Sequence, residues 1–149
     1  MVDLDLIELN MEAATAEEII QRLGELMAAK QYVKTSYINA VLEREKSLPT
    51  GLALGDFCVA IPHTDSVHVN QSTIAIACLK QAALFQSMID PQEQLKVELV
   101  FLLAVKDPNS QVQLLKNLMA VFQNKELLLQ IRNAASKREV SSLLNCLDL

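Results

Sequence analysis

The residues best suited to chemistry stand at the end of one apolar segment, Phe57-Cys58-Val59-Ala60-Ile61-Pro62-His63. Phe57 to Ile61 has the composition of a strand, and Pro62 ends it because proline has no amide proton to give to a sheet. His63 follows directly, so we expect its ring at the rim of the sheet, where solvent and a partner can reach it. Near pH 7 a neutral imidazole has a free lone pair, which makes His63 a candidate nucleophile.

Three interpretations of His63 remain open from the residues alone. The ring could hydrogen-bond a loop at the end of the strand and do no chemistry. It could bind a metal together with Asp65 and His68, although the pattern His-x-Asp-x-x-His matches none of the common zinc signatures. The third interpretation is a covalent phosphohistidine.

A histidine that takes up a phosphoryl group needs cations and hydrogen-bond donors around it. Phosphoryl transfer depends mostly on positioning and electrostatics. The planar fork of Arg44 suits phosphate, although its position is also that of a solvated helix residue paired with Glu45 or another acid. Other side chains with suitable donors are Thr50, Thr64, Ser66 and Gln111.

Gln111 and His68 are the two polar residues whose surroundings matter most for this interpretation. Gln111 falls in line with the apolar stripe Leu115, Leu118 and Phe122, so its side chain points partly inward and needs a partner. It could equally cap its helix. His68 could orient His63, or it could be a surface loop residue.

The composition indicates a folded protein and excludes some partners. Hydrophobic residues make up 51% of the 149 residues and charged residues 21%, which predicts one domain over residues 1–149. A net charge of -5 argues against nucleic-acid binding, which needs a basic surface. No segment reaches the roughly 18 apolar residues of a membrane span, so we expect no membrane insertion. The cysteines Cys58, Cys78 and Cys146 have no close pair, which predicts reduced thiols in the cytoplasm.

Hydrophobic periodicity predicts helices towards both ends of the chain and strands in the middle. The helices are expected at residues 15–30, 35–46 and 107–122, with two short ones from 124 and from 136. The strands are expected at residues 57–61, 73–79 and 97–105, with a weaker signal at 2–6. Capping boxes at Thr15 and Ser136 and the Asp107-Pro108 pair mark three of the helix starts. This order favours an α/β layered fold with a mixed sheet.

The residues around His63 resemble a known family. Arg44-Glu45, Pro49-Thr50-Gly51 and Val59-Ala60-Ile61-Pro62-His63 are similar to the IIA component of the bacterial sugar phosphotransferase system, of the mannitol–fructose class. The resemblance continues through Val97 to Leu103 and extends over essentially the whole chain. It implies a mixed sheet of roughly five strands flanked by helices.

The resemblance also implies roles for particular residues. His63 would accept a phosphoryl group from the phosphocarrier protein HPr and pass it to a cysteine of a IIB protein, which acts with a membrane IIC partner. Arg44 would belong to the pocket. Many members carry a second histidine where this chain has Gln111, whereas galactitol-type proteins carry glutamine there. The resemblance to this branch implies a galactitol-type phosphocarrier without a cofactor or metal. Because a shuttle must expose its site, we expect a monomer.

Two other classes of function stay open. A regulatory protein of the nitrogen-related IIA type would act through phosphorylation-dependent protein binding. Those proteins carry the second histidine, so Gln111 counts against this interpretation. A small metal-dependent enzyme would use His63, Asp65 and His68 and would purify with stoichiometric metal.

Overall fold

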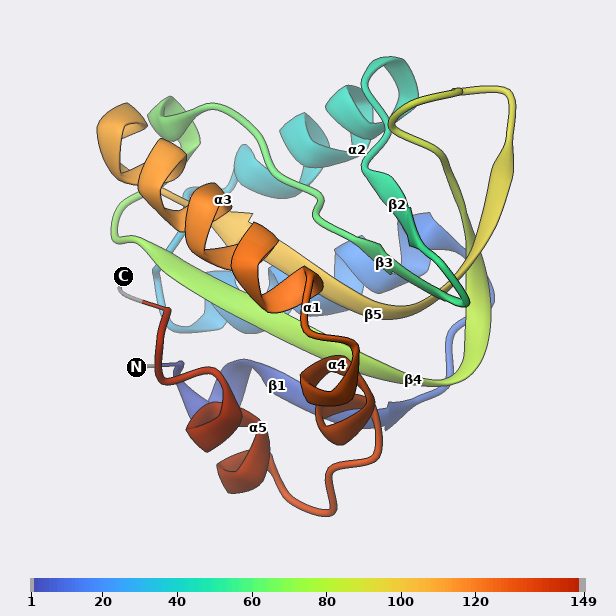
Figure 1. The fold of residues 1–149 in the computed structure, drawn as a ribbon. Helices are drawn as coiled ribbons and strands as arrows, with labels where there is room; N and C mark the ends of the chain where they lie inside the picture. The colour runs from blue at the N-terminus through green and yellow to red at the C-terminus, as the bar shows by residue number, and fades with distance from the viewer. Residues whose placement is uncertain (1, 148–149) are drawn as a thin grey trace.

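Helices cover both faces of the central sheet (Figure 1), and a hydrophobic core lies against each face. The computed structural model describes residues 2–147. One core lies under α1 (Ala16–Ala29) and α2 (Tyr37–Ser47). The other lies under α3 (Pro108–Phe122), α4 (Lys125–Arg132) and α5 (Lys137–Leu143). The expected α/β fold with a five-stranded mixed sheet flanked by helices is confirmed.

In the strand order β1-β4-β5-β3-β2, the strand that leads to His63 is β3, which lies between β2 and the central strand β5. The strands are β1 (Ile7–Met11), β2 (Gly51–Leu54), β3 (Phe57–Ala60), β4 (Thr73–Gln86) and β5 (Gln94–Ala104). β3 runs parallel to β5, with Ala60 beside Val100, while β2 and β4 are antiparallel to these neighbours. Because β3 and β5 are parallel, the segments that follow them leave the sheet at the same edge.

The strand expected at residues 2–6 was placed wrongly. Leu4–Leu6 forms a short 3-10 helix, and the strand begins at Ile7. The Asp3 side chain accepts a hydrogen bond from the Asp5 amide, and it also binds Lys30 and Tyr32. These contacts favour a turn where the alternation of apolar and acidic residues indicated a strand.

Two features of the sheet were missed. β2 is only four residues long and forms a hairpin with β3 through Gly55, whose φ of 75° suits glycine. β4 continues well beyond the predicted end at 79, with an irregularity in pairing between Cys78 and Ala83, and β5 begins three residues before the predicted start at 97. The far part of this hairpin turns back toward β2, as Figure 1 shows.

The predicted helix starts at 15, 107, 124 and 136 are confirmed by their side-chain caps. The helix expected from 35 begins at Tyr37, and its N-cap Ser36 makes no side-chain hydrogen bond. Thr15 accepts from the Glu18 amide at 3.1 Å, and the caps Asp107, Asn124 and Ser136 make equivalent bonds. The inner face of α3 is centred one residue from the predicted stripe: Leu114 is buried and Leu115 is partly buried. All three cysteines are free, although Cys58 is only half-buried and Cys146 is exposed.

Candidate functional site

His63 lies just beyond the end of β3, on a segment held at both sides. The Leu103 amide of β5 donates to the Pro62 carbonyl at 3.0 Å, and the Ile61 amide donates to the Thr50 carbonyl at 3.4 Å. The Leu103 carbonyl in turn accepts from the buried Tyr37 hydroxyl of α2 at 2.6 Å. His63 itself is half-buried, which agrees with the predicted position at the rim.

The imidazole of His63 is oriented by the backbone. Its Nδ1 lies 2.8 Å from the Ile61 carbonyl oxygen. Because a carbonyl can only accept, Nδ1 carries the proton, and in the neutral ring Nε2 keeps the free lone pair. Burial lowers the pKa of His63 below its ordinary value of 6.5, and the Arg44 charge lowers it further against the opposing effects of Ile61 and Asp65. The neutral, nucleophilic form is therefore favoured at pH 7.

Arg44 reaches the surroundings of His63 from the last turns of α2. Its Nη1 is 4.0 Å from the Asp65 carboxylate, and its Nε is buried without a hydrogen-bond acceptor among residues 2–147. An open depression of about 550 Å³ is lined by Arg44, Thr64 and Asp65, together with the end of α2. Arg44 is thus not paired with Glu45, and a buried donor without a partner favours an anion as ligand.

Glu45 is a site residue whose role sequence reasoning missed. Its carboxylate accepts from the Thr50 amide at 2.9 Å and from the Thr50 hydroxyl at 2.8 Å. Thr50 is therefore occupied with Glu45 and is buried, so its side chain is not a donor to a ligand at His63. The signal was present in the spacing of Arg44-Glu45 and Thr50-Gly51, but only the folded chain shows which residues pair.

His68 does not orient His63. Its Nδ1 is 2.8 Å from the Ser36 hydroxyl, and its carbonyl accepts from the Lys34 amide. Within residues 2–147, no three His, Cys, Asp or Glu side chains are grouped so that they could hold a metal ion. The proposed trio of His63, Asp65 and His68 is therefore not a metal cluster in this structure.

Gln111 occupies the first turn of α3, where its backbone amide donates to the Asp107 carbonyl. The helix starts four residues after β5 ends, at the edge where β3 also ends. The Gln111 side chain is half-buried, and no hydrogen bond to it occurs within the described part of the chain. The expected partner is thus not found. Ser66 lies further along, in a 3-10 helix (Ser66–His68).

The comparison with known families gives a direct match. Residues 1–146 match the family model described as phosphoenolpyruvate-dependent sugar phosphotransferase system, EIIA 2. The chain belongs to this family of phosphotransferase-system IIA proteins. Its members are phosphotransferases, which supports a phosphocarrier role in sugar phosphotransfer.

The relatives of this chain are named for different sugar alcohols, and one is named as a transcriptional regulator. The galactitol-specific EIIA component of Escherichia coli K12 is 31% identical over 111 residues, which are 74% of this chain and 73% of the relative. The mannitol-specific IIA component of Enterococcus faecalis is 28% identical over 138 residues, 91% and 90% of the two chains. The transcriptional regulator ManR of Bacillus subtilis is 36% identical over 101 residues, 68% of this chain but 14% of ManR.

Solved structures confirm the fold of the IIA family. Enzyme IIAMTL of Escherichia coli, solved in complex with phosphorylated enzyme IIBMTL, superposes with a TM-score of 0.82 at 24% identity over 97% of both chains. The crystal structure of IIA mannitol from the same species gives 0.79 at 26% identity, with 97% and 99% of the chains covered. None of the helices between residues 2 and 147 has the length and apolar character needed to cross a bilayer.

Proposed function

We propose that His63 is the residue that carries the phosphoryl group. The observation that supports this most strongly is the bond between His63 Nδ1 and the Ile61 carbonyl. It leaves Nε2 as the nucleophilic nitrogen, in a ring whose pKa is lowered and which lies within the electrostatic influence of Arg44. This combination of a fixed tautomer, a neutral ring and one cation suits the uptake of phosphate.

The transfer step follows from this geometry. The Nε2 lone pair attacks phosphorus in line with the bond to the donor, the N–P bond forms, and the donor leaves with the electrons of its own bond to phosphorus. The Nδ1 proton stays on the ring and remains bonded to the Ile61 oxygen. The phosphorylated ring then carries a positive charge, which the carbonyl dipole stabilises.

Arg44 supplies the charge that the phosphoryl oxygens require. Its Nε lacks an acceptor, and its Nη1 lies 4.0 Å from the Asp65 carboxylate, so the guanidinium keeps donors that an oxyanion can use. A single cation also suits a carrier, which must release the group again: only stabilisation that is greater in the transition state than in the phosphorylated protein speeds both steps. We assign Gln111 a weaker, neutral contact from α3.

We propose HPr as the phosphoryl donor and a cysteine of a IIB protein as the acceptor, with the IIB protein acting together with a membrane IIC component. The known complex of the related IIA protein with a phosphorylated IIB protein supports the acceptor. We propose galactitol as the sugar alcohol, because the galactitol-specific relative is 31% identical and the mannitol-specific one 28%. A single IIA domain over residues 1–149, acting as a monomer, completes the proposal.

A regulatory role is the second candidate. Part of the transcriptional regulator ManR is 36% identical to this chain, which favours a function in which the phosphorylation state of His63 controls binding to another protein. The chemistry at His63 would be the same, and only the partner would differ.

The experiment is incubation of the chain with phosphoenolpyruvate, enzyme I and HPr, followed by measurement of the intact mass. We expect a gain of one phosphoryl group that is labile in acid and absent from His63→Ala. A wild-type protein that gains no mass would contradict the phosphocarrier proposal. Purified IIB proteins for galactitol and mannitol, offered as acceptors to the phosphorylated chain, then separate transport from regulation.

A further inference from the structure

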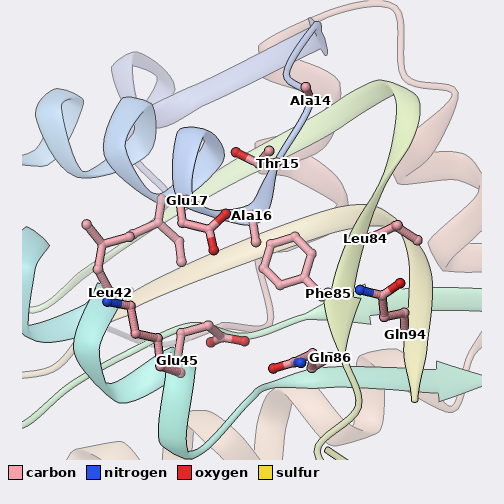
Figure 2. Close-up of a pocket in the computed structure, with 12 residues that line it drawn as sticks. Ala14, Thr15, Ala16, Glu17, Leu42, Glu45, Leu84, Phe85, Gln86 and Gln94 are labelled. Carbon is pink, nitrogen blue, oxygen red and sulfur yellow. The ribbon is translucent and has the colours of Figure 1, made fainter. Parts of the chain in front are cut away.

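Arg44 and Glu45 are neighbours in sequence whose side chains leave α2 on different sides. Arg44 lines the open depression beside Thr64 and Asp65. Glu45 lines a separate pocket of about 360 Å³ between the start of α1, the end of α2 and the β4–β5 hairpin. Figure 2 shows the Glu45 side chain extending from α2 toward β4, where Phe85 and Gln86 lie. The phosphoryl transfer proposed above assigns no role to Glu45.

A continuous series of hydrogen bonds connects Glu45 to the His63 ring. The Glu45 carboxylate holds Thr50 by both its amide and its hydroxyl, at 2.9 and 2.8 Å. The Thr50 carbonyl accepts from the Ile61 amide at 3.4 Å, and the Ile61 carbonyl accepts from His63 Nδ1 at 2.8 Å. Between Glu45 and the His63 ring, the series runs through the backbone of Thr50 and Ile61, which pair with each other beside the end of β3.

Gly51 fixes the same segment from the other direction. A Cβ atom at Gly51 would lie 2.7 Å from the Gln86 carbonyl oxygen, so only glycine allows this close approach of β2 to the end of β4. The Gly51 carbonyl also accepts from the Met88 amide at 2.8 Å. Thr50 is therefore held between α2 and the β4–β5 hairpin, and through its carbonyl it holds Ile61 on the side opposite to β5.

We infer that Glu45 and Thr50 are positioning residues for His63: they fix the Ile61 carbonyl, which holds the ring in the tautomer that leaves Nε2 free. This inference rests on the proposed phosphoryl transfer at His63, but it concerns the unphosphorylated ring. A carbonyl displaced by about 1 Å would weaken the Nδ1 bond, and misplacement on this scale costs on the order of a hundredfold in rate.

The protonation of Glu45 does not break the series. Burial raises the pKa of its carboxyl to about 7, the bonds from Thr50 oppose the rise, and the negative charge of Glu17 adds to it. Lys46 also lines this pocket. When protonated, Glu45 still accepts from the Thr50 amide, and its own hydroxyl can donate to the Thr50 oxygen. The uncharged amide of Glu45→Gln offers the same pair of bonds and is therefore the conservative variant.

The test compares four variants with a matched control. Glu45→Ala removes both bonds to Thr50, and Thr50→Val removes only the hydroxyl bond, whereas Glu45→Gln and Thr50→Ser can keep both. The control is Glu18→Ala, which removes a carboxylate bond to the Ala14 amide in the capping box of α1. For each protein, ¹⁵N NMR of the unphosphorylated His63 ring reports its tautomer, and single-turnover uptake from phosphorylated HPr gives the rate.

In the wild type we expect a protonated Nδ1 and an unprotonated Nε2. In Glu45→Ala the two ¹⁵N shifts should move toward each other, and uptake should slow by on the order of tenfold or more. Thr50→Val should show a smaller change in the same direction, and Glu45→Gln and Thr50→Ser should restore both readouts.

Unchanged ¹⁵N shifts in both Glu45→Ala and Thr50→Val would overturn the inference, even if uptake slowed, because the loss would not act through the ring. The same holds if Glu18→Ala changed the shifts equally. If Glu45→Ala fails to fold, Thr50→Val decides alone, since it keeps the side-chain size and the amide bond. The NMR result does not depend on phosphorylation, so a wild-type protein that takes up no phosphoryl group would fail the proposed function without affecting this test.

Discussion

The two histidines of the chain lie five residues apart on one connection, yet their surroundings differ in kind. His63 Nδ1 faces the Ile61 carbonyl, and the ring is half-buried beside Arg44. His68 lies in the short helix that follows, and its Nδ1 faces the hydroxyl of Ser36, the N-cap residue of α2. A carbonyl only accepts hydrogen bonds, whereas a hydroxyl can donate or accept.

This difference decides which ring can act as a prepared nucleophile. At His63 the partner fixes the proton on Nδ1, so the lone pair of the neutral ring is always on Nε2. At His68 the hydroxyl can adjust to either tautomer, and the ring is not committed. In this contrast the hydrogen-bond partner, more than the presence of a histidine near a strand end, determines which ring nitrogen keeps its lone pair.

The largest difference is expected when each ring is removed in turn. His63→Ala should lose phosphoryl uptake completely, whereas His68→Ala should keep a full gain of one phosphoryl group, because only Nε2 of His63 is prepared to attack. The measurement is intact mass at neutral pH, since Ser47 to Lys80 contains both rings and no internal lysine or arginine for trypsin. Uptake lost from His68→Ala and kept in His63→Ala would reverse the assignment.

Removing the nearest cation from each region should give the next largest effect. Arg44→Gln should slow single-turnover uptake by about a hundredfold, the usual cost of losing one preorganised group that stabilises transition-state charge. Lys34, whose ammonium donates to the Val67 carbonyl near His68, is the matched control. Lys34→Gln should stay close to wild type, and an equal loss in both variants would point to general charge steering of the donor protein.

The pH dependence of uptake should distinguish the two rings as well. Burial and Arg44 lower the pKa of His63 below 6.5, so the reactive neutral form is already present at pH 7 and is lost only as the pH falls below 6.5. The rate should be flat above pH 7 and decline in acid. Arg44→Gln should shift this decline to higher pH, whereas His68→Ala should leave it in place. Single-turnover reactions with phosphorylated HPr prepared beforehand measure this profile.

The smallest effect is expected at Gln111. If its amide donates to a phosphoryl oxygen held by His63, Gln111→Ala should slow uptake about fivefold, since one neutral hydrogen bond contributes about 1 kcal/mol. Gln113, two residues along the same helix, bonds Asn117 and provides the control as Gln113→Ala. Equal uptake rates for the two variants would contradict a contact between the Gln111 side chain and the phosphoryl group.

Features that depend on local chemistry could be predicted from the sequence. Thr15, Asp107 and Ser136 cap their helices as expected because each cap bonds an amide two or three residues away. The position of His63 at the rim also follows from one local fact, the missing amide proton of Pro62. Its ring orientation does not, because it depends on the position of the Ile61 carbonyl, in a segment bonded to Thr50 on one side and to the distant Leu103 on the other.

Features that depend on contacts distant in sequence were beyond a prediction from spacing. The pattern could not distinguish an Arg44–Glu45 pair from the actual division, in which Arg44 faces Asp65 and Glu45 binds Thr50. β2 was missed because a four-residue strand has too little periodicity to recognise, and its pairing is fixed by β3. The turn at Leu4–Leu6 was missed because Asp3 is held by Lys30 and Tyr32, more than 25 residues away.

The two backbone hydrogen bonds of Leu103 affect how easily the segment before His63 can leave the sheet. The Leu103 carbonyl accepts from the buried Tyr37 hydroxyl and its amide donates to the Pro62 carbonyl, so this one residue of the central strand joins α2 to the segment before His63. Fluctuations that release the segment before His63 therefore have to break its bond to the end of β5, and core strands are among the elements whose local opening costs most. The half-buried ring at the rim of the sheet is thus tied, through its own segment, to one of the most deeply buried strands of the core.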